Sequence, residues 1–363
     1  MPRIDDSSST GSGASAVRLL DYDGGPVVAD YGEVDAEWAA LDAGVGIVEA
    51  TWRCFFPATG EERRDFLHGQ TSADVRSLRA GEGRAALVLT AQGRPLAMPA
   101  IYEDGDRIWI ATTAAHQAAT RAALSRFLVA DDCDFEDVVE ASSLTLVGPR
   151  AADLLATLGA LPRESTPTWS VASVSIAGQP VMLFGRADFR VPAFDLLVCD
   201  AEGNAGDAAA VRAALHAAGA MPCGATALDI VRVESGCVRY GVDVDEQRIG
   251  VEARLEWAIH FAKGCYVGQE VIERAVSRGR INHELGLLRV DAEISIGALV
   301  EGGGERDVVT SVVRSPKHGV LALAYLPKAK FEPGSAVVLR GVEDAVSATV
   351  QTWPRPRVLA GRS

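Results

Sequence analysis

The stretch from Lys263 to Glu270, KGCYVGQE, places a lysine, a thiol, a phenol, an amide and a carboxylate within eight residues. A lysine beside a cysteine favours the thiolate, the form that acts as a nucleophile, redox centre or soft-metal ligand. Gly264 and Gly268 permit close backbone approaches that a β-carbon would block. Lys263 and Cys265 are therefore the candidate catalytic pair. The alternative is a cysteine that packs as a small apolar group, which is the commoner fate of an intracellular cysteine.

The length and charge of the chain narrow the class of protein. A chain of 363 residues exceeds what one hydrophobic core usually supports, so we expect two or three packed subdomains. The formal net charge of −14 repels phosphate, so we expect no direct nucleic-acid binding and no contact with anionic membranes. A local basic pocket for a small anionic ligand is still compatible with this charge. No window approaches ~18 uninterrupted apolar residues, which argues against a transmembrane helix.

The N-terminus and the cysteines bear on the cellular compartment. Residues 1–16, MPRIDDSSSTGSGASA, lack the apolar segment of a secretory signal and are expected to form a disordered tail. The six cysteines are far apart and form no CxxC pair, so the spacings of zinc ribbons and ferredoxins are absent. Reduced thiols are expected rather than disulfides, and the expected localisation is cytoplasmic.

The pattern of apolar residues predicts an α+β body. Strand-like and helical runs follow one another as strand, strand, helix, strand, helix, which favours a split α+β arrangement over a doubly wound sheet. Strands are expected at 85–90, 107–111, 143–147, 170–176, 180–184 and 194–198. Helices are expected at 36–41, 114–127, 151–158 and 205–218, and VIERAV at 271–276 also has helical spacing.

The C-terminal part differs from the body. From residue 286 onward, short strand-like runs are split by glycine and proline, and helical patterns almost vanish. This predicts a small β-barrel-like domain at 286–357. The body is expected at 17–285 and is divided into two α+β subdomains, the first roughly at 17–160.

Several stretches together resemble the YgfZ family, folate-binding relatives of the glycine-cleavage T protein (GcvT aminomethyltransferase). The octapeptide at 263–270 matches all seven defined positions of K-G-C-Y-x-G-Q-E. Residues 227–259 resemble a T-protein segment that reads R-x-E-x-G and then Y-G-x-D-x-D-E. FLHGQTSADV at 66–75 and AQGR at 91–94 resemble F-L-x-G-Q-x-T-x-D-V and G-K/R, with a shift between threonine and serine. The resemblance covers most of residues 30–350 and implies a GcvT-like three-part ring, with the barrel as one part.

The resemblance also implies a site for tetrahydrofolate or a one-carbon-substituted folate. One carboxylate can accept hydrogen bonds from both the exocyclic amine and the N3–H of a pterin. The acids available in this region are Glu234 and the Asp245–Glu246 pair, on either side of Tyr240, whose ring is suited to stacking on the pterin or covering its edge. The alternative for Glu234 is an ion pair with Arg232 or Arg239 on the surface of a strand.

Two arginines are candidates for the carboxylates of the folate tail. Arg274 and Arg278 are four residues apart and therefore share one face of a helix, where they could bind a carboxylate. Glu270 and Arg274 have the same spacing, so the alternative is a helix-surface pair worth ~0.3–0.5 kcal/mol.

One departure from the T-protein pattern bears on catalysis. T proteins carry an aspartate pair after a Gly-Gly at the point that corresponds to Gly93, and that aspartate orients the folate amine. Ala97 and Met98 hold those positions in this sequence. Alanine cannot accept a proton or hold a positive amine, so the T-protein mechanism of aminomethyl transfer is expected to be lost, and whether the chain is an enzyme is left open.

Three functions follow from these observations. The resemblance implies a tetrahydrofolate-binding YgfZ-like protein that supports the assembly or repair of iron–sulfur clusters, including those of tRNA-modifying enzymes, with iron–sulfur proteins or assembly factors as partners. The alternative is a folate-dependent one-carbon transferase of aminomethyltransferase-like or demethylase-like type. A third hypothesis is a scaffold with a vestigial pocket. The chain offers no ligand set for a stable cluster of its own, and no metal site is predicted.

Overall fold

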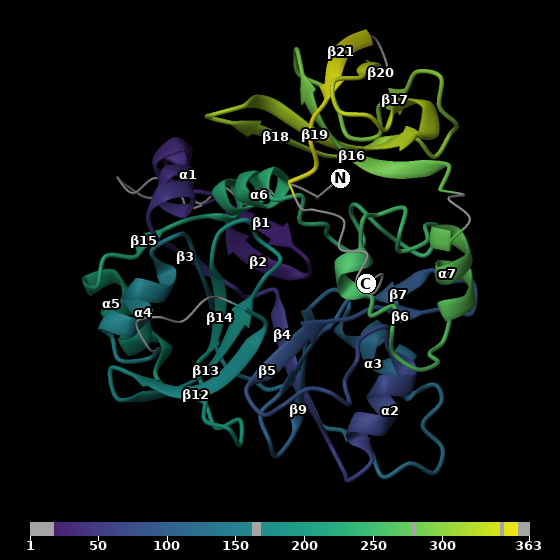
Figure 1. The fold of residues 1–363 in the computed structure, drawn as a ribbon. Coiled ribbons are helices and arrows are strands. Elements are labelled where there is room, and N and C mark those ends of the chain that lie inside the picture. The colour runs from purple at the N-terminus through teal and green to yellow at the C-terminus, as the bar shows by residue number, and fades with distance from the viewer. Residues whose placement is uncertain (1–17, 162–167, 278–280, 342–344, 355–363) are drawn as a thin grey trace.

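The structure is a computed structural model that describes residues 18–161, 168–277, 281–341 and 345–354. Two sheets dominate it. Figure 1 shows the smaller sheet, built from the C-terminal residues, above the larger one, with α4 and α5 beside one end of the larger sheet and α2, α3 and α7 beside the other. The predicted tail at 1–16 lies outside the described residues, and so does Arg278.

The larger sheet has eleven strands in the order β10-β4-β9-β8-β5-β12-β13-β14-β11-β3-β15. A single pair of residues, Glu82 and Ser170, joins its two halves through β5 and β12. The strands are β3 (Gly46–Glu49), β4 (Arg53–Thr59), β5 (Glu82–Ala85), β8 (Ala100–Glu103), β9 (Ile108–Thr113), β10 (Asp134–Phe135), β11 (Ser143–Val147), β12 (Ser170–Ile176), β13 (Gln179–Arg186), β14 (Ala193–Leu197) and β15 (Met221–Pro222).

The hairpin of β12 and β13 shows how local sequence fixes the register. Ile176 pairs with Gln179, so the turn holds only Ala177 and Gly178, both with positive φ of 52° and 75°. Such two-residue turns match the twist of antiparallel strands. The strands predicted at 170–176 and 180–184 therefore occur, and a two-residue turn joins them.

The two halves of the larger sheet are not consecutive blocks of sequence. Strand β3 lies in the second half and pairs with β11. β11 and helix α4 share a core with β13 and β14. Residues 143–157 thus belong to the second half, whereas the predicted first subdomain, roughly 17–160, includes them. The division of the chain into independent domains stays a prediction.

The helices cover the sheets and connect them. They are α1 (Val34–Ala43), α2 (Arg63–Gln70), α3 (Gln117–Ser125), α4 (Ala151–Thr157), α5 (Ala208–Ala217), α6 (Ala225–Glu234) and α7 (Gln269–Ser277). Two small hairpins lie beside them, β1 (Leu19–Tyr22) with β2 (Gly25–Val28), and β6 (Val88–Leu89) with β7 (Pro95–Ala97). Among the described helices, none is both long and apolar enough to cross a membrane.

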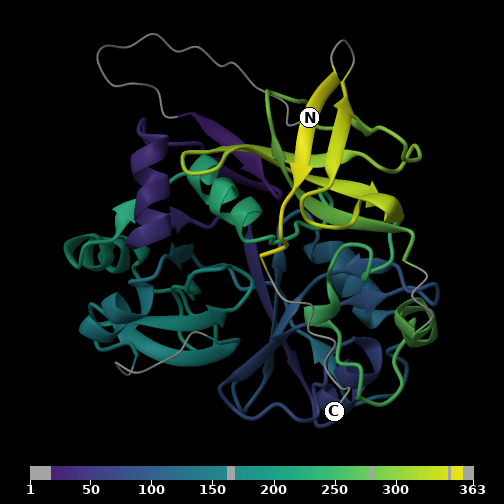
Figure 2. The same cartoon turned by 45° about the horizontal axis from the view of Figure 1, so that its top comes forward.

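Glu234 lies in helix α6 (Ala225–Glu234) and is buried. The alternative considered for Glu234, an ion pair on the surface of a strand, is therefore wrong about the element. Eight of the ten residues of α6 are buried, among them Arg232 and Glu234, because the helix packs against α1 on one side and the C-terminal sheet on the other. Figures 1 and 2 show this position between the two layers. A helix buried on most sides lacks the one-sided apolar pattern that identifies helices in sequence.

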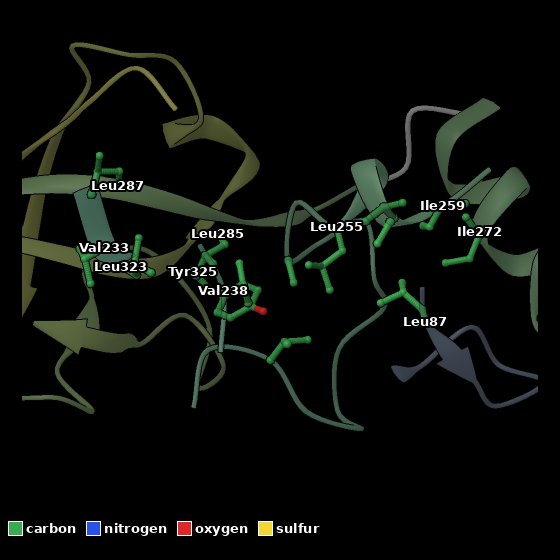
Figure 3. Close-up of a cluster of buried hydrophobic side chains, with 14 of the residues drawn as sticks. Leu87, Val233, Val238, Leu255, Ile259, Ile272, Leu285, Leu287, Leu323 and Tyr325 are labelled. Carbon is green, nitrogen blue, oxygen red and sulfur yellow. The ribbon is translucent and has the colours of Figure 1, made fainter. Parts of the chain in front are cut away.

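The smaller sheet has six strands in the order β17-β20-β21-β16-β19-β18. They are β16 (His283–Val290), β17 (Leu299–Val300), β18 (Val309–Ser315), β19 (Gly319–Pro327), β20 (Ala336–Arg340) and β21 (Ala345–Val350). Alternate residues of β16 face two cores: Leu285 and Leu287 pack toward the body, whereas Leu288 and Val290 pack within the C-terminal sheet. Figure 3 shows the first of these cores, where Val233 of α6 meets Leu287 and Leu323, and Ile272 of α7 lies near Leu87.

Candidate functional site

A cavity of about 120 Å³ lies where the N-terminal hairpin, both halves of the larger sheet, and α6 with the segment after it meet. At ~10–15 Å³ for each water position, it is larger than an incidental packing void. Its walls combine four arginines with aromatic rings. Its lining residues include Tyr22, Asp23, Arg53, Met98, Thr113, His116, Trp169, Arg186, Asp188, Arg232, Arg239, Tyr240 and Trp257.

Arg232 anchors the wall formed by α6. Its guanidinium, 3% exposed, donates to Asp243 at 2.6 Å, to Asp229 at 2.6 Å and to the hydroxyl of Ser311 at 2.8 Å. Burial alone would raise the pKa of Asp229, but the positive charges of Arg232 and Arg239 reverse this effect and hold it below its ordinary value. Removal of one member of such a buried pair typically costs about 3–5 kcal/mol. This network joins α6 to the C-terminal sheet and fixes one side of the cavity.

A second ionic group lies at the Arg186 side. Arg186 donates to Asp188 at 3.0 Å and to Asp195 at 3.3 Å, and Asp195 also pairs with Arg53 at 2.8 Å. The side chain of Arg53 is 10% exposed, and its Nε has no hydrogen-bond partner among the described residues. A buried donor without a partner is costly, so it marks a position where a ligand acceptor would be stabilised.

A third group closes the cavity from the N-terminal hairpin. The guanidinium of Arg239 lies 4.0 Å from the ring centre of Tyr22 and donates to Asp23 at 2.6 Å. Asp23 belongs to the turn between β1 and β2, which contacts the chain at Ala115 through a backbone hydrogen bond of 2.8 Å. Three segments that are far apart in sequence therefore meet at one corner.

Tyr240 and His116 form the next part of this wall. The Tyr240 hydroxyl donates to the carbonyl of Pro95 at 3.1 Å, and its ring meets the His116 imidazole edge to face with centroids 4.9 Å apart. Burial raises the pKa of Tyr240 to about 12, and the charge of Glu246 adds to this effect. Tyr240 is thus a neutral hydrogen-bonded ring that lines the cavity, and its contact with a ligand stays a prediction.

Ala97 and Met98, at the two positions where T proteins carry aspartates, differ in environment. Met98 lines the cavity, whereas Ala97, the last residue of β7, is 1% exposed and packs in a hydrophobic core. The cavity therefore meets an apolar thioether at the point where the resemblance places an acid.

The octapeptide at 263–270 contains the predicted catalytic pair, Lys263 and Cys265. The ammonium of Lys263 is buried and donates to the carbonyls of His68, Thr71 at 2.5 Å and Ala73 at 3.0 Å. Burial lowers the pKa of Lys263 to about 8, so the side chain is charged at pH 7. His68 lies in the last turn of α2 and Thr71 is the residue that ends it. Lys263 thus binds the carboxyl end of α2, where a positive charge is favoured.

Gly268, the second glycine of the octapeptide, lies where a side chain would not fit. Its φ is +84°, and a β-carbon there would overlap the carbonyl oxygen of Thr90. On the other side of the contact, a β-carbon on Gly93 would stand 3.2 Å from the side chain of Val271. The octapeptide and the turn between β6 and β7 therefore interlock, and β7 leads directly to Met98. Much of the motif positions the wall of the cavity.

Cys265 is exposed, as are Gly264 and Glu270 of the same octapeptide. The other five cysteines are buried or half-buried, and burial raises the pKa of Cys199 and Cys223 to about 12 and that of Cys133 to about 11. In the described ranges, no three His, Cys, Asp or Glu side chains are grouped to hold a metal ion. Cys265 is therefore available to a partner or reagent in solution, and it does not line the cavity.

The other predicted ligands lie elsewhere. Glu234 accepts from Ser315 at 2.6 Å, Arg190 at 2.8 Å and Trp38 at 3.2 Å, so its carboxylate joins α1, α6 and the C-terminal sheet. These partners differ from Arg232 and Arg239, the partners in the alternative considered for Glu234. Glu234 was predicted to contact the ligand, and it does not line the cavity.

Glu246 and Arg274 also lie apart from the cavity walls. Glu246 is exposed, and its backbone carbonyl accepts from Arg94 at 3.4 Å. Arg274 is exposed and pairs with Glu270, which is the alternative considered for it. Of the predicted ligand residues that the structure describes, Tyr240 is the one that lines the cavity.

The cavity contains residues that sequence reasoning missed. Arg53, His116 and Arg186 come from segments with no motif, and only folding brings them to Tyr240. The sequence carried one usable signal, the proximity of Arg232 and Arg239 to Tyr240 in a segment already assigned to the ligand. It assigned the ligand contacts to the acids of that segment, whereas the arginines and aromatic rings form the walls.

Comparisons with known proteins agree with this architecture. The structure of the glycine cleavage system aminomethyltransferase T from Bartonella henselae superposes with a TM-score of 0.81, over 93% of this chain and 94% of that one, at 20% identity. The fold is thus that of the GcvT-like proteins, which confirms the predicted α+β architecture.

Sequence comparison gives the family. Residues 22–263 match the GCVT N-terminal domain model, and the chain belongs to this family. An aminomethyltransferase of Rubrobacter xylanophilus is 27% identical over 346 residues, which cover 94% of this chain and 91% of the relative. A putative chloroplastic transferase of Arabidopsis thaliana is 24% identical and covers 90% of this chain and 75% of the relative.

Proposed function

We propose that this protein binds a reduced folate in the cavity and catalyses folate-dependent transfer of a one-carbon group. The observation that carries the proposal is the combination of flat aromatic walls with a buried donor that lacks a partner. Trp169 and Trp257 are parallel within 5°, with centroids 6.1 Å apart, and the ring of Tyr240 lines the same cavity. Aromatic faces suit a flat bicyclic ring such as a pterin.

The polar groups of the cavity fit the same ligand. A pterin presents a carbonyl acceptor, and the Nε–H of Arg53 is a donor without a partner in the described part of the chain. Its guanidinium is held by Asp195, so it is already oriented before any ligand arrives. The ionic groups around Arg186 and Arg232 are paired with acids and fix the walls. A folate would supply the nucleophilic nitrogen that accepts the one-carbon unit.

The apolar Met98 separates this proposal from aminomethyl transfer by the T-protein route. A thioether cannot take up a proton or orient an amine, so the proton must go to another group. The proposed class is therefore a one-carbon transferase of aminomethyltransferase-like or demethylase-like type.

Calorimetric titration with tetrahydrofolate tests the binding step. Wild type should bind, and both Arg53→Met and Tyr240→Leu should weaken binding at least tenfold, because each removes one type of wall contact. Arg340→Met is the matched control: this arginine is 57% exposed and pairs with Glu301 in the C-terminal sheet, so affinity should not change. Absence of heat for wild type at 1 mM ligand would refute the binding proposal.

A transfer assay tests the second step. Tetrahydrofolate and a lipoyl-bound aminomethyl donor, or a free aminomethyl thioether, are mixed with the protein, and methylene-tetrahydrofolate is measured. Turnover above the uncatalysed rate supports the transferase. Binding without turnover from either donor would refute the transferase and leave the second candidate function below.

The second candidate is a YgfZ-like role in the cytosol, in which the folate-bound protein supports iron–sulfur cluster assembly or repair for partner proteins. One observation favours it: Cys265 of the YgfZ-like octapeptide is exposed, outside the cavity. Lys263 would then position this loop through α2. Cys265→Ala should fold normally but fail to complement loss of a cluster-assembly factor, and full complementation would refute this role.

A further inference from the structure

His116 lines the same cavity as Met98, one of the two positions that lack an acid. His116 immediately precedes α3, which contacts β7, and Met98 follows β7 by one residue. Tyr240 joins the two, because its hydroxyl binds the carbonyl of Pro95 and its ring edge meets the imidazole. Both His116 and Met98 line the cavity. A titratable ring thus lies beside the segment where the acid is missing.

The ring of His116 is held by one nitrogen. Its Nδ1 lies 3.0 Å from the hydroxyl oxygen of Thr113. A hydroxyl can accept from Nδ1–H or donate to Nδ1, and the first arrangement leaves Nε2 as an acceptor. Thr113 is three residues earlier, at the end of β9, so strand and helix together fix the plane of the ring.

Gly241 lies against the other edge of the ring. A β-carbon at this position would stand 2.9 Å from Nε2 and 3.0 Å from Cε1 of His116. The φ of Gly241 is +83°, a conformation that other residues rarely adopt. The backbone conformation therefore favours glycine here, and the absence of a side chain leaves room beside Nε2 for the imidazole in its present position.

The surroundings keep His116 neutral. Burial lowers its pKa, and of the charged groups that face it, Asp23 of the N-terminal hairpin raises the pKa whereas Arg239 lowers it. Tyr240 contacts the ring as a neutral phenol. The amino end of a helix also disfavours a positive charge. A neutral imidazole has a lone pair to accept a proton at pH 7.

We propose that His116, through Nε2, is the proton acceptor of the cavity, held in that tautomer by Thr113 and given room beside Nε2 by Gly241. This inference rests on the proposed one-carbon transfer. As an amine nitrogen forms its bond to the one-carbon unit, the bond from that carbon to the leaving group breaks with its electron pair. His116 takes the proton that the nitrogen loses and gives it to the leaving group, so no oxidant or reductant is needed.

Two measurements test the role of His116. The first is the transfer assay on His116→Gln, which keeps size and polarity but cannot take up a proton. Proton transfer by a positioned side chain contributes about 10²–10⁴-fold. We expect tetrahydrofolate affinity within threefold of wild type and single-turnover transfer reduced at least 100-fold. His318→Gln, at an exposed position in the C-terminal sheet region, is the control and should retain both.

The second measurement does not depend on activity. Long-range nitrogen–proton NMR of histidine-labelled wild type, with the His116 signal assigned from its loss in His116→Gln, reports the tautomer at pH 7.5. We expect a proton on Nδ1 and none on Nε2, and Thr113→Val should shift the ring toward the other tautomer.

The outcomes separate the two proposals. If wild type binds no folate, the proposed function fails, and the role of His116 fails with it. If wild type binds and transfers while His116→Gln transfers within threefold of it, only the role of His116 fails. A proton on Nε2 in wild type at pH 7.5 also overturns it, whatever the activity and even if His116→Gln does not fold.

Discussion

The change Lys263→Met tests whether this lysine positions the loop or acts in chemistry. Methionine keeps an unbranched chain of similar size and removes the ammonium, so the carbonyl oxygens of His68, Thr71 and Ala73 lose a buried donor. A buried acceptor left without a partner costs about 1–3 kcal/mol, and the relief from burying no charge offsets part of the sum. We expect unfolding free energy to fall by about 3 kcal/mol.

Chemical denaturation measures this loss, with thermal unfolding as a second readout. At about 2 °C for each kcal/mol in a large domain, the midpoint should fall by roughly 6 °C. Lys317→Met is the matched control, because Lys317 is exposed in the turn between β18 and β19 and should change stability by less than ~0.5 kcal/mol. If both variants unfold at the wild-type midpoint, the three hydrogen bonds do not stabilise the fold and the positioning role is refuted.

Three further predictions follow from the same structure. Gly268→Ala should lower the unfolding free energy by more than ~2 kcal/mol in chemical denaturation, because it combines backbone strain with overlap of the new β-carbon and the Thr90 carbonyl oxygen. Gly297→Ala is the control: its φ is +87° and no neighbour lies within 4 Å, so it should cost about 1 kcal/mol. Equal losses in the two variants would contradict the contact between the octapeptide and the turn from β6 to β7. The folded-state pKa of Asp229 lies below its ordinary 3.8, so its contribution is present above pH 3.8 and is lost as the pH falls through the lower folded value. Asp229→Asn should therefore be less stable than wild type at pH 7, with the gap narrowing on acidification below pH 3.8, and a constant gap would refute this linkage with Arg232. Iodoacetamide should label Cys265 before the other thiols, as mass spectrometry of the native protein can show, and Cys265→Ser should remove the fast phase; first labelling elsewhere would contradict the exposure.

The parts of the fold that sequence predicts are those with local signals. Strand β11 (Ser143–Val147) follows its apolar run, and the hairpin of β12 and β13 follows from its turn residues. Helix α6 is not predicted from the sequence, because burial on most sides removes the one-sided apolar periodicity that identifies a helix. Its end at Glu234 binds Trp38 and Ser315, which are 196 and 81 residues away, and no local pattern encodes such partners.

The candidate site is predictable to a similar extent. The sequence singles out Tyr240 and the octapeptide, since both lie in motif-like stretches. It does not place Arg53 or His116 on the cavity, because their partners Asp195 and Tyr240 are 142 and 124 positions away by residue number. A lysine two residues before a cysteine is compatible with two arrangements, one in which the ammonium faces the thiol and one in which it faces another part of the chain. In the fold the Lys263 ammonium binds the end of α2.

The hydrogen bonds from Lys263 to the end of α2 have a consequence for how the chain is made. Lys263 is 195 residues beyond His68, so α2 leaves the ribosome long before its last carbonyls can be bound. At ~5–20 residues per second, the delay is about 10–40 s. During that time the turn between β6 and β7 also lacks its partner Gly268. The wall that carries Met98 can therefore reach its final form only when the octapeptide has emerged, so a nascent chain that stalls before residue 263 presents an unfinished cavity to the chaperones and proteases around it.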